Sequence, residues 1–330
     1  MIFLSLIVVL ALVHFTDTAK ILQWDGWFTV VLKKLRALPA VSSVPLLPMI
    51  IALVLPLILL MMAIWAVVHF LGGHFLFFLY VPVLLYSLGR GNFLAEINQY
   101  IEAANRGDSV AASKMVDDMC GHAANDISVS DVSEWKQLHT QALRVISYRG
   151  FERTFAVLFW FVIAGAVGAL LYRLSAIYRE QTETNSAEAI LAEKWLWLIE
   201  FPAVRLMGLT WAFVGNFDSC PLRDSLLDTE NSSMSVLNNS LRGALSAPTD
   251  LYITPATIAE SEEKSAEEVA EEKQEAEENA QEVIEDLVGI TLSPQAEPAY
   301  SFALVKSSVP LYSRSLLFWI GAIAFATLFI

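Results

Sequence analysis

ERTFAVLFWFVIAGAVGALLYRL, residues 152–174, is the stretch that decides the fold class of this chain. Nineteen uncharged residues separate Arg153 from Arg173. A helix needs about 20 predominantly apolar residues to cross a hydrocarbon core of about 30 Å. We therefore expect this segment to cross a membrane as one helix, with its charged ends at the depth of the lipid headgroups.

The composition of the whole chain also indicates an integral membrane protein. Of 330 residues, 55% are hydrophobic and 17% are charged, whereas a typical soluble domain has about 25% charged residues. The net charge of −14 is local, because residues 260–287 contribute −11 and the rest of the chain −3. The sequence lacks a basic field suited to nucleic acid, so the predicted partner is the lipid bilayer.

Three further apolar segments predict more membrane helices. Residues 1–15 lack the basic residues that open a signal peptide, so we expect a retained N-terminal anchor. Residues 46–88 are long enough for two crossings, and Gly72-Gly73 marks the turn of this transmembrane hairpin. Residues 312–330 predict a C-terminal transmembrane anchor.

The segment 194–217 is apolar but contains Glu200, Pro202 and Arg205. A proline between two charges in the middle of a span favours a broken or re-entrant helix whose charges face the protein interior. Together with the opening stretch, this segment makes residues 152–217 a transmembrane signature region.

The remaining segments are more polar. Residues 16–45 place aromatic and basic side chains at helical spacing, which favours an interfacial amphipathic helix over a plain connector. Residues 89–151 indicate a small soluble helical region. Residues 218–311 form a polar, acidic, low-complexity tail that we expect to be disordered or a lone solvated helix. The predicted fold class is all-α, a polytopic integral membrane protein with a soluble helical loop and a disordered acidic tail.

Lysine and arginine residues near the span ends set the expected orientation. If all of them are cytoplasmic, the N-terminus is outside, residues 194–217 cross, the acidic tail is cytoplasmic and the C-terminus is periplasmic. If residues 194–217 only dip into the membrane, the tail lies outside instead. We favour the first arrangement.

The candidate functional residues lie in or beside the spans, because a charge inside hydrocarbon is costly and is usually paired or functional. For Arg153 and Arg173, at span ends, snorkelling of the side chain to the headgroups is the favoured explanation. For Glu200 and Arg205, a buried polar cluster is at least as good an explanation. The candidate polar cluster comprises Glu152, Arg153, Tyr172, Arg173, Glu200 and Arg205.

No motif in the sequence predicts a catalytic residue, a cofactor or a metal site. Cys120 and Cys220 are the only cysteines, and two distant cysteines make neither a disulfide framework nor a zinc site. Asp108, Asp117 and Asp118 are better explained as the wet face of a short helix than as a cation site. The sequence has no nucleotide-binding glycine loop, zinc-protease helix or nucleophile elbow.

Two segments carry a family resemblance. FERTFAVLFWFVIAGAVGALLYRL (151–174) and FPAVRLMGLTWAFVGNF (201–217) resemble the AmpE family, inner-membrane proteins associated with regulation of chromosomal β-lactamase in Gram-negative bacteria. The resemblance covers about residues 1–217 and 312–330, and the acidic tail carries no family motif. It implies a non-enzymatic, multi-pass regulatory protein of the inner membrane, linked to β-lactamase induction and the response to antibiotic, with an unidentified membrane or cell-wall-signalling partner.

The same segments are more distantly similar to the cobalamin-biosynthesis membrane enzymes of the CobD/CbiB type. The acidic and amide residues that flank the span in those enzymes are largely missing, since Glu152 is the only acid in residues 148–152 and residues 176–179 contain none. This similarity implies an enzyme's scaffold without its reactive groups. The alternative is a membrane enzyme on a cobinamide-synthase-like scaffold, with a polar pocket formed by Glu152, Arg173, Glu200 and Arg205. The shared positions are Phe159-Trp160, Gly165, Gly168-Ala169-Leu170, Tyr172-Arg173 and Pro202-Ala203-Val204-Arg205-Leu206.

Overall fold

The structure is a computed structural model of an all-α membrane protein, so the predicted fold class is confirmed. No strand occurs among the residues that it describes, and the predicted disorder of the acidic stretch at 260–287 lies outside them. The described residues are 2–15, 25–38, 46–88, 93–120, 135–182, 186–217, 219–220, 231–245 and 296–328.

Four helical segments are long and apolar enough to cross a membrane. They are α5 (Leu46–Phe70), the continuous stretch Trp135–Glu180, α11 (Ala187–Val214), and Pro298–Phe325 within α16 (Ala296–Leu328). On α5 the side chains of large apolar residues such as Met62 (62% exposed) point outward. An apolar surface of this extent belongs against lipid rather than water.

The N-terminal helices pack as the sequence predicts for a hairpin with an interfacial segment. After α5 the chain turns at Gly72, whose φ of 95° suits glycine. It then enters α6 (Leu76–Ser87) through a short 3₁₀ turn, Gly73–Phe75. α6 packs against α1 (Ile2–Phe15), and the amphipathic α3 (Gly26–Arg36) packs on α5.

A pair of shorter helices follows. α7 (Phe93–Asn105) and α8 (Ser109–Cys120) meet at Gly107, whose φ is 73°. The Asp108 carboxylate accepts a hydrogen bond from the Ala111 amide at 3.0 Å, which caps the N-terminus of α8. α8 packs on α9 (Trp135–Gly150).

The opening stretch turns back on itself, so the prediction of one straight crossing is wrong. α9 continues through a π-helical turn, Phe151–Phe155, into α10 (Ala156–Glu180). At Gly165 the backbone has φ 62° and ψ −152°, a conformation that is essentially restricted to glycine. The chain reverses there so tightly that a Cβ on Gly168 would lie 2.4 Å from the Trp160 carbonyl oxygen. We call the two parts of this segment, 135–163 and 166–180, the arms of the α10 hairpin.

α11 is a continuous helix from Ala187 to Val214, so the expected break at Pro202 is not present. A proline removes only its own backbone hydrogen bond, and packing on both sides of it holds this helix together. The prediction that its charges face inward is correct, because Glu200 is 2% exposed and Arg205 is 8% exposed.

Helices also occupy part of the range predicted as a polar tail. α13 (Ser233–Ala244) packs on α11 and α9 through a stripe that includes Val236, Leu237 and Leu241. α16 begins at Ala296 and runs along α9, where the Tyr312 hydroxyl donates to the Ile146 carbonyl at 2.9 Å. These short apolar stripes lie among polar residues, so they have little weight in a composition average.

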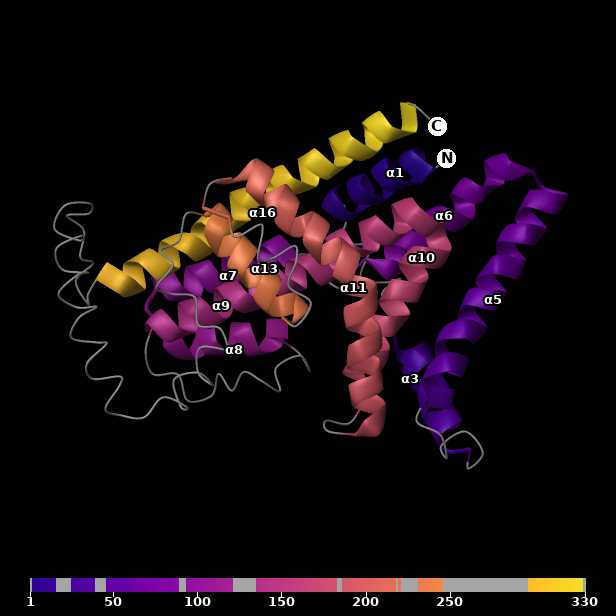
Figure 1. Ribbon diagram of the computed structural model, residues 1–330, viewed down its shortest axis with the longest axis horizontal. Helices are drawn as coiled ribbons and strands as arrows, with labels where there is room; N and C mark the ends of the chain where they lie inside the picture. Colours follow the sequence, from indigo (N-terminus) through magenta and orange to yellow (C-terminus); the bar gives the residue numbers. More distant parts are fainter. Residues whose placement is uncertain are drawn as a thin grey trace, which may run out of the picture.

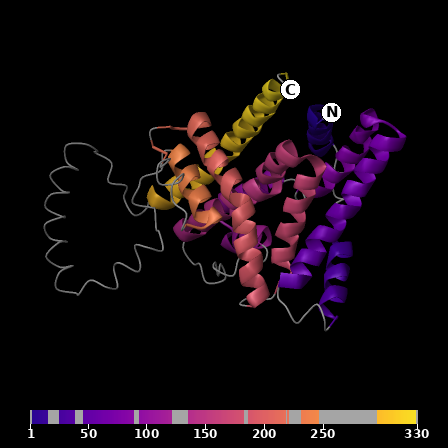
Figure 2. The ribbon, with the colours of Figure 1, turned by 45° about the vertical axis from the view of Figure 1, so that its right-hand side comes forward.

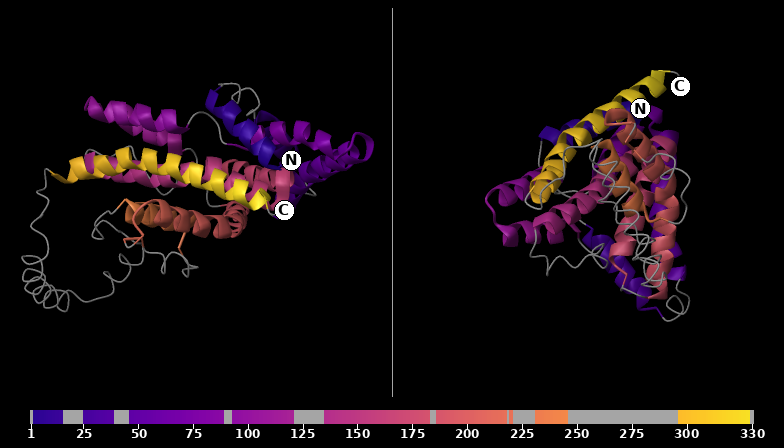
Figure 3. Two further views of the ribbon diagram at one scale, coloured as in Figure 1. Left: turned by 90° about the horizontal axis from the view of Figure 1, so that it is seen from above. Right: turned by 60° about the vertical axis from the view of Figure 1, so that its left-hand side comes forward.

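The helices form two groups. Figures 1 and 3 show α7, α8, α9 and α13 gathered at one end of the molecule and α5 and α6 at the other. α10 and α11 lie between them (Figure 2). α1 contacts the yellow helix α16 near its C-terminal end (Figure 1). The functional question therefore concerns the region between the two groups.

Candidate functional site

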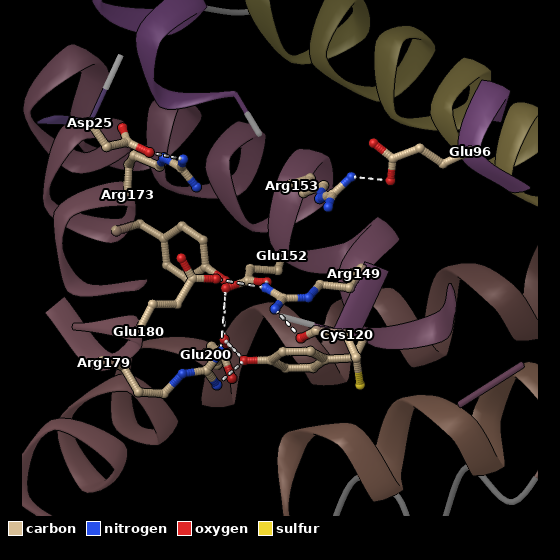
Figure 4. A network of polar contacts seen from close by, with 12 residues as sticks. Asp25, Glu96, Cys120, Arg149, Glu152, Arg153, Arg173, Arg179, Glu180 and Glu200 are labelled. Carbon is tan, nitrogen blue, oxygen red and sulfur yellow. Dashed lines mark hydrogen bonds and ion pairs between the residues drawn. The ribbon is translucent and has the colours of Figure 1, made fainter. Parts of the chain in front are cut away.

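The reversal at Gly165 brings distant charges together at the open end of the α10 hairpin (Figure 4). Arg149 and Glu180 are 31 residues apart in sequence, yet Arg149 Nη1 lies 3.0 Å from Glu180 Oε1. α11 crosses the same place and adds Glu200. We call the resulting group the Arg149 network. Its members are Tyr148, Arg149, Glu152, Tyr172, Arg179, Glu180 and Glu200.

Arg149 joins three parts of the chain. Its guanidinium donates to Glu152 in the π-helical turn and to Glu180 at the end of the second arm. It also donates to the backbone carbonyl of Cys120, the last residue of α8. The final carbonyls of a helix have no partner within the helix, so Arg149 satisfies one of them with a charged donor.

Glu152 lies between two guanidinium groups. It is 3% exposed, accepts from Arg149 through Oε2, and has Oε1 3.6 Å from Arg179 Nη2. Among the described residues, those two facing atoms are buried and have no hydrogen-bond partner. The carboxylate is therefore hydrogen-bonded to one arginine and within reach of the other.

Tyrosine hydroxyls connect this group to α11. Arg179 Nη1 donates to the Tyr148 hydroxyl at 2.8 Å, and that hydroxyl donates to Glu200 Oε1 at 2.9 Å. Tyr172 donates to the same oxygen at 3.0 Å. The chain of bonds from Arg179 through Tyr148 to Glu200 joins both arms of the hairpin to α11.

The network contains two arginines and three carboxylates, nearly balanced in charge. Buried charges require partners, and removal of one member of a buried pair typically costs about 3–5 kcal/mol because the other is left uncompensated. The arrangement therefore holds α8, the α10 hairpin and α11 in one relative position.

The six residues of the predicted cluster divide into three environments. Glu152, Tyr172 and Glu200 belong to the Arg149 network. Arg153 pairs with Glu96 of α7 at 2.6 Å, and Arg173 pairs with Asp25 at 3.0 Å. Figure 4 shows both pairs beside the network.

Snorkelling is therefore the wrong explanation for Arg153 and Arg173. Their side chains are 17% and 11% exposed and bind carboxylates of other helices. The physical reason is the hairpin, which places both ends of the opening stretch against protein. Arg205 lies over the ring of Phe201, 3.7 Å from its centroid.

Sequence reasoning missed Tyr148, Arg149, Arg179 and Glu180 as site residues. One signal was available, since a Tyr-Arg dipeptide occurs at 148–149, 172–173 and 178–179. In each dipeptide the tyrosine hydroxyl donates to a glutamate of α11, and Tyr178 donates to Glu188. Each arginine makes an ion pair with a carboxylate of another segment.

The described part of the chain holds no group of three or more histidine, cysteine or acidic side chains placed to bind a metal ion. On α8, burial and the neighbouring Asp118 raise the pKa of Asp117 above its ordinary value. His69, which the sequence places near the Gly72 turn, stacks on Trp65 with centroids 5.1 Å apart.

A family model described as "Regulatory signalling modulator protein AmpE" matches residues 1–250. No curated protein and no solved structure matches the chain. The matched range contains the whole Arg149 network and extends beyond residue 217 to include α13.

Proposed function

The chain belongs to the AmpE family, and we propose that it is a regulatory protein of the bacterial inner membrane in which the Arg149 network links the α7–α8 pair to the membrane helices. Membership of a family of regulatory signalling modulators is the observation that carries this proposal. In finer terms, we propose a role in β-lactamase induction and the response to antibiotic, exerted with a membrane or cell-wall-signalling partner.

The contacts of Arg149 support this link. A displacement of α8 moves the Cys120 carbonyl, and Arg149 is bonded to that carbonyl and to both arms of the hairpin. A regulatory protein needs such a rigid connection between the element that receives a signal and the element that responds.

The position of Glu152 supports a change of state. Because Arg179 lies within 3.6 Å of the free oxygen of Glu152, the carboxylate can exchange its hydrogen bond with Arg149 for one with Arg179 without entering lipid. Two pairings of one buried carboxylate are the kind of discrete alternative on which a switch depends.

One observation favours the alternative of an enzyme on a cobinamide-synthase-like scaffold. Glu152 and Glu200 converge on the same network, as that hypothesis requires. Arg173 instead binds Asp25 and Arg205 packs on Phe201, so the four residues do not line one pocket. The carboxylates that do converge are already engaged by arginine or tyrosine.

Deletion of the gene distinguishes the two functions. We expect a β-lactam to induce β-lactamase to an altered level in the deletion strain, while growth without cobalamin is unchanged. The full-length gene supplied in trans restores induction. A cobalamin requirement together with normal induction would overturn the regulatory proposal in favour of the enzyme.

A further inference from the structure

A hollow of about 290 Å³ lies between α3, α6 and α10, apart from the Arg149 network. We propose that it receives an acyl chain of an anionic phospholipid whose phosphate is held by Lys34. The site is independent of the regulatory proposal. The lining residues are Trp27, Pro82, Val83, Tyr86 and Leu170.

The walls of the hollow are fixed in place. Trp27 Nε1 donates to the Tyr86 hydroxyl at 3.1 Å, which joins α3 to α6. Next to it, Arg173 of α10 pairs with Asp25 at 3.0 Å. Leu170 and Arg173 are three residues apart and share a helix face. The ion pair therefore anchors α3 beside the apolar wall that Leu170 provides.

The direction of α3 places a cation at a suitable distance. Trp27 and Lys34 are seven residues apart, so they project within about 20° of one another and about 10 Å apart along the axis. Phe28 and Leu32 occupy the inner face, at 0% and 1% exposure, while Lys34 is exposed. A lipid lying along this face has its phosphate at Lys34 and its chain beside Trp27.

The chemistry of the face selects the occupant. Tryptophan and tyrosine side chains prefer the boundary between headgroup and hydrocarbon, and a basic residue near that boundary attracts anionic lipid. The hollow itself has mostly apolar walls, which suit a hydrocarbon chain. A phospholipid with a net negative headgroup satisfies both parts of the site.

Fluorescence quenching tests the proposal on the full-length protein in nanodiscs. Phosphatidylglycerol or phosphatidylcholine with brominated acyl chains is added at equal mole fraction, and the difference from Trp27→Phe isolates the emission of Trp27. We expect phosphatidylglycerol to quench Trp27 at a lower mole fraction than phosphatidylcholine. Equal quenching by the two lipids, or none, would overturn the proposal.

Two lysine variants provide a matched comparison. Lys34→Gln should weaken the phosphatidylglycerol effect about fivefold, the loss expected for one lysine near an anionic lipid. Lys33→Gln removes the same charge from a position about 100° around the helix and should keep the effect. An equal loss in both variants would indicate general attraction and contradict the site. Leu170→Phe, which fills the hollow, should reduce quenching of Trp27 by either lipid.

Discussion

At the scale of single residues, burial sets the chemistry of the cysteine that follows α11. Cys220 is 8% exposed and its thiol lies 3.6 Å from the Ser240 carbonyl. Burial raises the pKa of Cys220 from an ordinary value of 9.0 to about 11. The folded protein therefore holds the thiol proton more tightly than the unfolded chain does.

This shift predicts the pH dependence of alkylation. In a Cys120→Ser variant, initial rates of iodoacetamide labelling of folded Cys220 should rise with a midpoint near pH 11, against about 9 after denaturation. Because the raised pKa favours the folded state only while the thiol is protonated, the free energy of unfolding should fall as pH rises from 9 to 11. A midpoint near 9 in the folded protein would contradict the burial of this side chain.

At the scale of elements, the α10 hairpin makes a prediction that separates it from a straight span. Spin labels at Thr154→Cys and Gln181→Cys, with the native cysteines replaced by serine, are separated by 27 residues. One straight helix would place their Cα atoms about 40 Å apart. The hairpin brings the two positions to the same open end, so electron–electron resonance should report a much shorter distance. A single distance near 40 Å would restore the straight crossing.

The elements that could be predicted from sequence are those with local causes. The turn at Gly72, the α7–α8 pair with Asp108 as its cap, and the amphipathic α3 each follow from neighbouring residues. The reversal at Gly165 could not be predicted, because glycine is common in membrane helices and the apolar pattern continues on both sides of it.

The same limit applies to the site. Glu152, Tyr172 and Glu200 were predicted because they interrupt or border apolar segments. Arg149, Arg179 and Glu180 were missed because a straight span assigns them to opposite ends of a helix. Once the chain reverses, Arg149 and Glu180 lie at nearly equal distances from Gly165, 16 residues before and 15 after it. The network is thus a consequence of one backbone conformation.

At the scale of the whole molecule, ion pairs join segments that are far apart in sequence. Asp25 binds Arg173, Arg36 binds Glu188, Glu96 binds Arg153, and Arg149 binds both Glu152 and Glu180. Most of these pairs are at least partly buried, so each also fixes the position of one helix on another. The Arg149 network differs from the others because it reaches α8, at the end of the molecule away from α5.

Loss of Arg149 should therefore loosen distant elements together. Arg149→Met leaves Glu152 and the Cys120 carbonyl without their arginine donor, and a buried pair broken in this way costs about 3–5 kcal/mol. Hydrogen exchange should become faster in α8 and at the end of α10 in the same variant. Arg36→Met serves as the control, because its pair with Glu188 is 30% and 21% exposed and its effect should stay at the start of α11. Unchanged exchange in α8 would mean that Arg149 stabilises the hairpin alone and does not connect it to the α7–α8 pair.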